Sequence, residues 1–135
     1  MKVTETVQIN ADQSKIWDTL KSFQNPEKYI LLVQNSTING SGQGATRKCQ
    51  VQLGDQSFTV NETLRAVDDS NKSLIISLDK APSPMQGLEF QYKISPSDNK
   101  SDLEISTEIA DSPEMEQMMR GLLSMIAQGI KKFHE

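Results

Sequence analysis

The end of the chain has the apolar spacing of one long helix, whereas most of the sequence before it alternates with the period of strands. In residues 113–133, apolar side chains recur at intervals typical of an amphipathic helix, which would be about 30 Å long. This stripe consists of Met115, Met118, Met119, Leu122, Ile126, Ile130 and Phe133. Such a helix must bury its stripe, so we expect the upstream strands to form a sheet that it covers.

Seven segments alternate apolar and polar residues and are predicted to be strands. They are residues 2–9, 32–40, 45–53, 56–67, 73–78, 88–94 and 103–109. Residues 10–23 have helical spacing, and residues 25–30 begin with Asn-Pro, which suits the start of a second short helix. Because strands and helices are segregated along the chain, we expect an α+β fold with about six to seven antiparallel strands. The length, 135 residues, predicts a single domain over residues 1–135.

Composition disfavours several classes of function. Asp and Glu outnumber Lys and Arg by 18 to 14, which argues against nucleic acid as a partner. No long apolar or basic run occurs, so we expect neither an integral membrane segment nor a polybasic anchor. Cys49 is the single cysteine and His134 the single histidine, which disfavours internal disulfides, metal sites and histidine-dependent catalysis. We therefore expect no metal, no cofactor and a cytoplasmic location.

Two charged residues interrupt the apolar phase of neighbouring predicted strands. Arg47 precedes a Gly54-Asp55 turn, and Glu62 follows it. A two-residue turn at this point would place the two charges directly opposite each other, within contact distance across the strands. An unpaired buried charge is costly, and pairing offsets much of that cost. We interpret the pair first as structural and alternatively as a polar anchor for a ligand carboxylate, hydroxyl or carbonyl.

Four parts of the sequence carry a resemblance to a known superfamily. They are VQINADQSKIWDTL (7–20), the Gly-rich turn NGSGQGATRKC (39–49), VNETL (60–64) and the final amphipathic helix. Together they resemble the Bet v 1/START-like superfamily, also called SRPBCC or polyketide cyclase/lipid-transport-like. The resemblance implies a helix-grip fold, in which a curved antiparallel sheet wraps around the long C-terminal helix, with two short helices after the first strand and a cavity inside. Members bind lipids, polyketides, hormones or other apolar ligands, a minority are enzymes, and one branch activates a chaperone.

On this resemblance, the inner face of the sheet and the final helix would line a ligand cavity. The candidate ligand-binding residues are Arg47, Glu62, Phe58, Val60, Leu64, Leu88, Phe90, Tyr92, Met115, Met118, Met119 and Leu122. Methionine adapts to varied apolar partners, so the Met-rich first turns of the helix fit a pliable pocket wall as well as plain core. We assign no catalytic residue, and we expect an apolar or amphipathic small molecule as the partner.

Two alternative functions stay open at this point. One is a cyclase/dehydratase-type enzyme, in which Arg47 would polarise a carbonyl and Glu62, Glu5 or Tyr92 would transfer protons. The lack of an interior histidine argues against it, because histidine is the commonest general acid or base. The other is a protein interaction module similar to chaperone activators, although no large exposed apolar patch is evident. The sequence sets neither the ligand, nor a protein partner, nor the oligomeric state.

Overall fold

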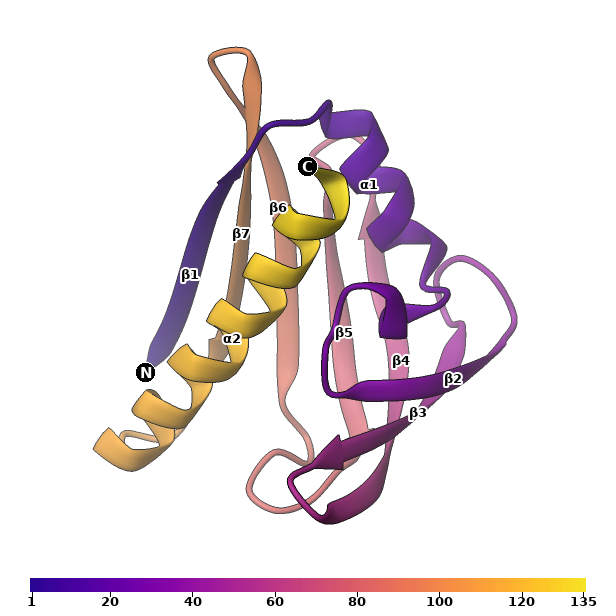
Figure 1. Cartoon of the computed structure of the whole chain (residues 1–135), viewed down its shortest axis with the longest axis vertical. Coiled ribbons are helices and arrows are strands. Elements are labelled where there is room, and N and C mark those ends of the chain that lie inside the picture. Colours follow the sequence, from indigo (N-terminus) through magenta and orange to yellow (C-terminus); the bar gives the residue numbers. More distant parts are fainter.

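One curved antiparallel sheet of seven strands forms the body of the protein, shown in Figure 1 for residues 1–135 of the computed structural model. The strands lie in the order β1-β7-β6-β5-β4-β3-β2, so the first strand of the chain is placed beside the last. Every other pair of neighbours is consecutive in the sequence, as hairpin connections require. The strands are β1 (Lys2–Ile9), β2 (Val33–Asn39), β3 (Thr46–Leu53), β4 (Gln56–Asp68), β5 (Ser73–Lys80), β6 (Glu89–Ser97) and β7 (Lys100–Glu108).

The C-terminal helix α2 (Pro113–His134) lies across the inner side of the sheet (Figure 1). Its start is fixed by Ser112, whose side chain accepts a hydrogen bond from the backbone N–H of Met115. Its buried residues are Met119, Leu123, Ile126, Ala127 and Ile130. The predicted α+β helix-grip architecture, with a curved antiparallel sheet around a long C-terminal helix, is confirmed.

Two short helical elements follow β1, as the sequence predicts, but the second is only one turn of 3₁₀ helix. They are α1 (Gln13–Ser22) and η1 (Pro26–Lys28). The carboxylate of Asp12 accepts a hydrogen bond from the backbone N–H of Ser14 and caps α1. The buried side chains of α1 are Ile16, Trp17 and Leu20. Phe23 then adopts a left-handed conformation with φ of 62°, which ends α1 and turns the chain toward η1.

The hairpin of β3 and β4 has the predicted register. Gly54 occupies the turn with φ of 63°, a conformation that glycine adopts without steric cost. Arg47 pairs with Glu62, and Cys49 pairs with Val60. Because alternate residues of a strand share a face, both charged side chains lie on the inner face together with apolar neighbours. The expected cross-strand juxtaposition is therefore confirmed.

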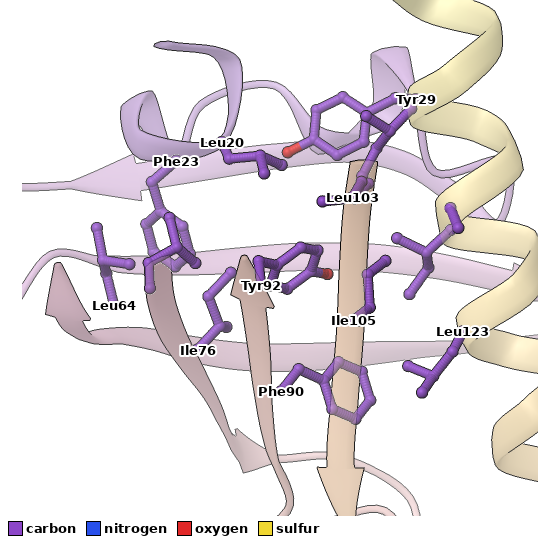
Figure 2. Packing of buried hydrophobic residues seen from close by; sticks show 14 of the residues in the cluster. Leu20, Phe23, Tyr29, Leu64, Ile76, Phe90, Tyr92, Leu103, Ile105 and Leu123 are labelled. Atoms are coloured by element: carbon purple, nitrogen blue, oxygen red, sulfur yellow. The ribbon is translucent and has the colours of Figure 1, made fainter. Parts of the chain in front are cut away.

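Part of the interior is filled by side chains from β6, β7 and α2 (Figure 2). We call this region the packed half and define it by Tyr92, Leu103, Ile105, Leu123 and Ile130, each at most 3% exposed. Close-packed interiors of this kind leave no space for a ligand. Any binding site on the inner face must therefore lie elsewhere along the sheet.

Glycine in α2 allows the helix to approach the chain at η1. A Cβ atom built on Gly129 would lie 1.9 Å from the carbonyl oxygen of Tyr29, which is far inside van der Waals contact. Only a residue without a side chain permits this approach. The C-terminal part of α2 is thereby held against the segment that leads into β2.

Candidate functional site

A cavity of about 330 Å³ lies between the inner face of the sheet and α2. Sixteen of its 19 lining residues are hydrophobic, and we call this region the open half of the interior. The wall consists of Ile30, Leu32, Val33, Cys49, Val51, Leu53, Phe58, Val60, Glu62, Leu78, Ala81, Pro82, Met85, Phe90, Met118, Gly121, Leu122, Met125 and Ile126. Small-molecule sites are typically apolar cavities of this size with a few polar groups.

Strands β3 and β4 supply the floor of the cavity through their alternation. Cys49 and Val51 come from β3, and Phe58, Val60 and Glu62 come from β4. These residues share one face because the side chains of a strand alternate and the hairpin register aligns the two sets. The floor therefore follows directly from the pattern of apolar residues in the sequence.

Helix α2 supplies the opposite wall through Met118, Leu122 and Met125, which are three or four residues apart and so share one face of the helix. Met118 is 42% exposed, unlike its neighbour Met119, which is fully buried. Gly121 also lines the cavity, and a Cβ atom there would meet no atom within 4 Å. This wall is therefore flexible in its side chains and has free space beside its backbone.

The remaining wall comes largely from segments outside regular structure, which the sequence analysis did not assign to the site. Ile30 and Leu32 precede β2, and Ala81, Pro82 and Met85 follow β5. These segments have no periodicity from which a face could be assigned. The only available signals were the apolar run around Ile30 and a methionine within a proline-containing loop.

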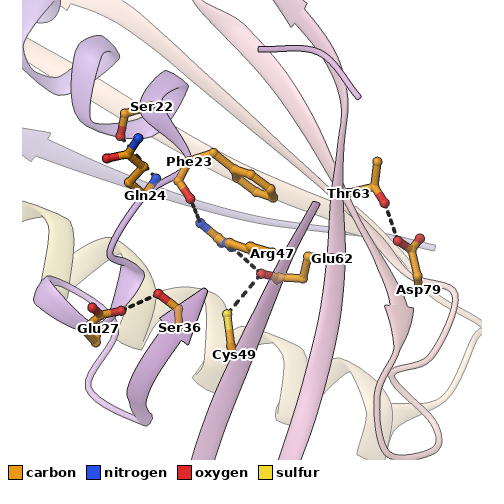
Figure 3. Close-up of polar contacts among 10 residues, drawn as sticks. All are labelled: Ser22, Phe23, Gln24, Glu27, Ser36, Arg47, Cys49, Glu62, Thr63 and Asp79. Atoms are coloured by element: carbon orange, nitrogen blue, oxygen red, sulfur yellow. Dashed lines mark hydrogen bonds and ion pairs between the residues drawn. The ribbon is translucent and has the colours of Figure 1, made fainter. Parts of the chain in front are cut away.

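The charged pair lies next to the cavity, because Glu62 is one of the lining residues. Figure 3 shows the polar contacts of the pair. Arg47 Nε donates to Glu62 Oε1 at 2.5 Å, and Arg47 Nη1 donates to the carbonyl oxygen of Phe23 at 3.3 Å. The Arg47 guanidinium carbon also lies 4.1 Å from the centre of the Phe23 ring, as in a cation–π contact. The exposed fraction is 3% for the Arg47 side chain and 12% for that of Glu62. Arg47 is thus enclosed by protein, and only Glu62 reaches the cavity wall.

Burial controls the protonation of the polar groups around this pair. Burial alone would lower the pKa of Arg47, but the Glu62 carboxylate raises it and the net shift is upward. Burial, reinforced by the Glu62 charge, raises the pKa of the Cys49 thiol to about 12. Burial likewise raises the pKa of Tyr92. At neutral pH the site therefore contains a charged guanidinium and neutral thiol and phenol groups.

The twelve sequence-predicted site residues divide evenly between the cavity wall and other positions. Those that line the cavity are Glu62, Phe58, Val60, Phe90, Met118 and Leu122. Those that do not are Arg47, Leu64, Leu88, Tyr92, Met115 and Met119. Leu64 and Met119 are fully buried in the core, whereas Leu88 and Met115 pack against its edge. Tyr92 belongs to the packed half (Figure 2).

Glu5 shares its phase on β1 with the buried Val3 and Val7, so it lies on the predicted inner face, but it does not join the charged pair. It pairs with Ile105 of β7, and β1 is the edge strand farthest from β3 in the sheet order. No group of three or more His, Cys, Asp or Glu side chains could hold a metal ion. None of the helices is both long enough and apolar enough to cross a membrane.

Comparison with known proteins relates the sequence to one family. The model of the family described as polyketide cyclase / dehydrase and lipid transport matches residues 1–134. The abscisic acid receptor PYL2 of Arabidopsis thaliana is 35% identical over 71 residues. That match covers 51% of this chain and 37% of the receptor, so the chain spans much less than the receptor's full length.

Three solved structures share the fold over nearly the whole of both chains. A protein of Nitrosospira multiformis has a TM-score of 0.80 at 17% identity, covering 100% of this chain and 97% of its own. For Ara h 8.0201 the TM-score is 0.77 at 15% identity, with coverage of 98% and 96%. Ginseng major latex-like protein 151 of Panax ginseng has a TM-score of 0.81 at 12% identity, with coverage of 99% and 97%. With its helix-grip fold and a family match from end to end, the chain belongs to the polyketide cyclase / dehydrase and lipid transport family of the SRPBCC, or Bet v 1-like, superfamily.

Proposed function

We propose that the protein binds an apolar or amphipathic small molecule, lipid-like or polyketide-like, in the cavity between the sheet and α2. The observation that carries this proposal is the cavity of about 330 Å³ with 16 hydrophobic residues among its 19 lining residues. Empty apolar space in an interior forfeits packing contacts, which an apolar ligand would restore. The family's description, which includes lipid transport, and the abscisic acid receptor among the relatives support the same class of function.

The ligand would contact two kinds of wall. Phe58, Val60 and Phe90 would pack against its apolar body from the sheet, and Met118 and Leu122 would close over it from α2. Apolar contacts are non-directional and grow with the apolar area that is buried. The wall would therefore select the size and polarity of the ligand more than its exact shape. Glu62 would meet any polar end of the ligand.

A binding role fits the site better than a catalytic one. Of the groups that the enzyme hypothesis names, Arg47 and Tyr92 lie outside the cavity wall. The Cys49 thiol has a pKa of about 12 because burial disfavours its thiolate, so it is a poor nucleophile at neutral pH. We further propose that residues 1–135 act as one domain in the cytoplasm, where this cysteine would stay reduced.

Binding of the neutral dye Nile red tests the proposal directly. We expect saturable fluorescence enhancement with the wild-type protein, and co-purified small molecules in native mass spectra. Gly121→Phe should abolish the signal, because Gly121 lines the cavity and has open space beside its Cα. Gln128→Phe is the matched control, since Gln128 is exposed on the same helix and does not line the cavity. Equal dye binding by the two variants would rule out the cavity as the site.

A further inference from the structure

We propose that the cavity selects a neutral molecule with one hydrogen-bond donor, such as a hydroxyl group, over a molecule that ends in a carboxylate. The donor would bind Oε2 of Glu62. This inference rests on the proposed function and specifies the chemistry of its ligand. It follows from how the charges of the buried pair are distributed between the protein interior and the cavity.

The positive member of the pair is not available to a ligand. Arg47 directs Nε to Glu62 and Nη1 to the backbone oxygen of Phe23, and the Phe23 ring covers its guanidinium. The side chain is only 3% exposed and is absent from the cavity wall. No Lys, Arg or His is present among the lining residues. A ligand carboxylate in the cavity would therefore have no cation to contact.

The negative member of the pair is available. Glu62 is the only acidic residue of the cavity wall. Its Oε1 accepts from Arg47 Nε and, at 3.6 Å, from the Cys49 thiol, as Figure 3 shows, whereas Oε2 accepts no hydrogen bond from the protein. Oε2 is also not among the fully buried atoms without a partner, which are Asn61 Oδ1 and His134 Nε2. The alternation of β4 places the Glu62 side chain on the same inner face as Val60.

The cavity therefore offers a ligand one negatively charged hydrogen-bond acceptor and no positively charged group. A hydroxyl group would donate to Oε2 and gain a hydrogen bond to a charged acceptor, which is stronger than one between neutral groups. A carboxylate would be repelled by Glu62 and would lose its hydration in an otherwise apolar space. A cationic ligand would also lose hydration on entering such a space, which favours a neutral donor.

Competition against Nile red with three ligands of equal chain length tests this selectivity. The ligands are decan-1-ol, 1-methoxydecane and decanoate, compared at pH 8 below their aggregation concentrations. We expect decan-1-ol to displace the dye at about tenfold lower concentration than the methyl ether, which lacks the donor. Decanoate should be weaker than both. Displacement by decanoate at the same or a lower concentration than decan-1-ol would overturn the inference and leave the proposed function intact. Failure of all three, together with no dye binding, would instead refute the proposed function.

The variant Glu62→Gln tests whether Glu62 causes the preference for the alcohol over the ether. Its amide keeps an oxygen for Arg47 and can present N–H groups to the cavity, so the preference for the alcohol over the ether should disappear. Glu116→Gln is the control, because Glu116 pairs with Arg120 on α2 and does not line the cavity. An unchanged preference in folded Glu62→Gln, checked by circular dichroism, would overturn the role of Glu62. If that variant does not fold, the wild-type ranking of the three ligands decides.

Discussion

The packed half and the open half of the interior lie between the same sheet and the same helix. The packed half is filled by side chains, whereas the open half contains a cavity. In the packed half, Leu123 of α2 and Ile105 of β7 are both fully buried (Figure 2). In the open half, Leu122 and Met125 are only partly buried and line a cavity of about 330 Å³. Adjacent residues of one helix therefore have different surroundings. The boundary between the packed half and the open half passes along α2.

The two glycines of α2 show the same division at the level of the backbone. Gly129 lies against the Tyr29 carbonyl with no room for a Cβ atom, whereas Gly121 faces open space. One glycine is required by close packing, and the other borders the cavity. Helix α2 is thus in close contact with the chain at Gly129, whereas the side of the helix that carries Gly121 borders the cavity.

The largest expected loss of stability from a single substitution is at one of two neighbouring leucines, one from each half. Leu123→Ala should lower the free energy of unfolding by about 4 kcal/mol, because it leaves a void in the packed half. Leu122→Ala should cost about 1 kcal/mol, because that side chain borders space that is already open. Urea denaturation of both variants measures the difference. Similar losses would mean that the cavity is closed around Leu122 in solution and that the two halves are equally packed.

The next largest expected loss of stability is at one of the two glycines of α2. Gly129→Ala should destabilise the protein by about 3 kcal/mol, because the new methyl group meets a backbone oxygen that can move only with the chain around η1. Gly121→Ala should stabilise it by about 1 kcal/mol through helix propensity alone. Thermal unfolding of the pair gives opposite shifts of the midpoint. Shifts of the same sign would contradict the close approach of α2 at Tyr29.

Much of the fold was predictable because it depends on local patterns. The turn at Gly54-Asp55 fixes the pairing of β3 with β4, and this alone predicts that Arg47 meets Glu62. The length of α2 and its apolar stripe predict a helix that covers the sheet. These inferences need only the period of each element and the geometry of one turn.

The division between packed and open halves was not predictable in the same way. Period-two alternation assigns Phe90 and Tyr92 to the same face of β6, yet Phe90 lines the cavity and Tyr92 is in the packed half. The outcome depends on where α2 crosses the strands, which no local pattern encodes. Ile30 and Met85 reach the cavity from irregular segments, whose side-chain directions depend on the completed fold.

The smallest expected effect tests whether water is excluded from Cys49 on the floor of the open half. The folded pKa of Cys49 is about 12 against an ordinary value of 9.0, because burial and the Glu62 charge disfavour the thiolate. Its contribution to stability is therefore complete below pH 9 and is lost as the pH rises toward 12, since the unfolded chain ionises first. Wild type should lose about 1 kcal/mol more than Cys49→Val between pH 8 and 9.5, measured by urea denaturation. The comparison cancels the tyrosines and lysines that both proteins share. Parallel curves would show that water reaches the thiol, and the floor of the cavity would then be hydrated when no ligand is bound.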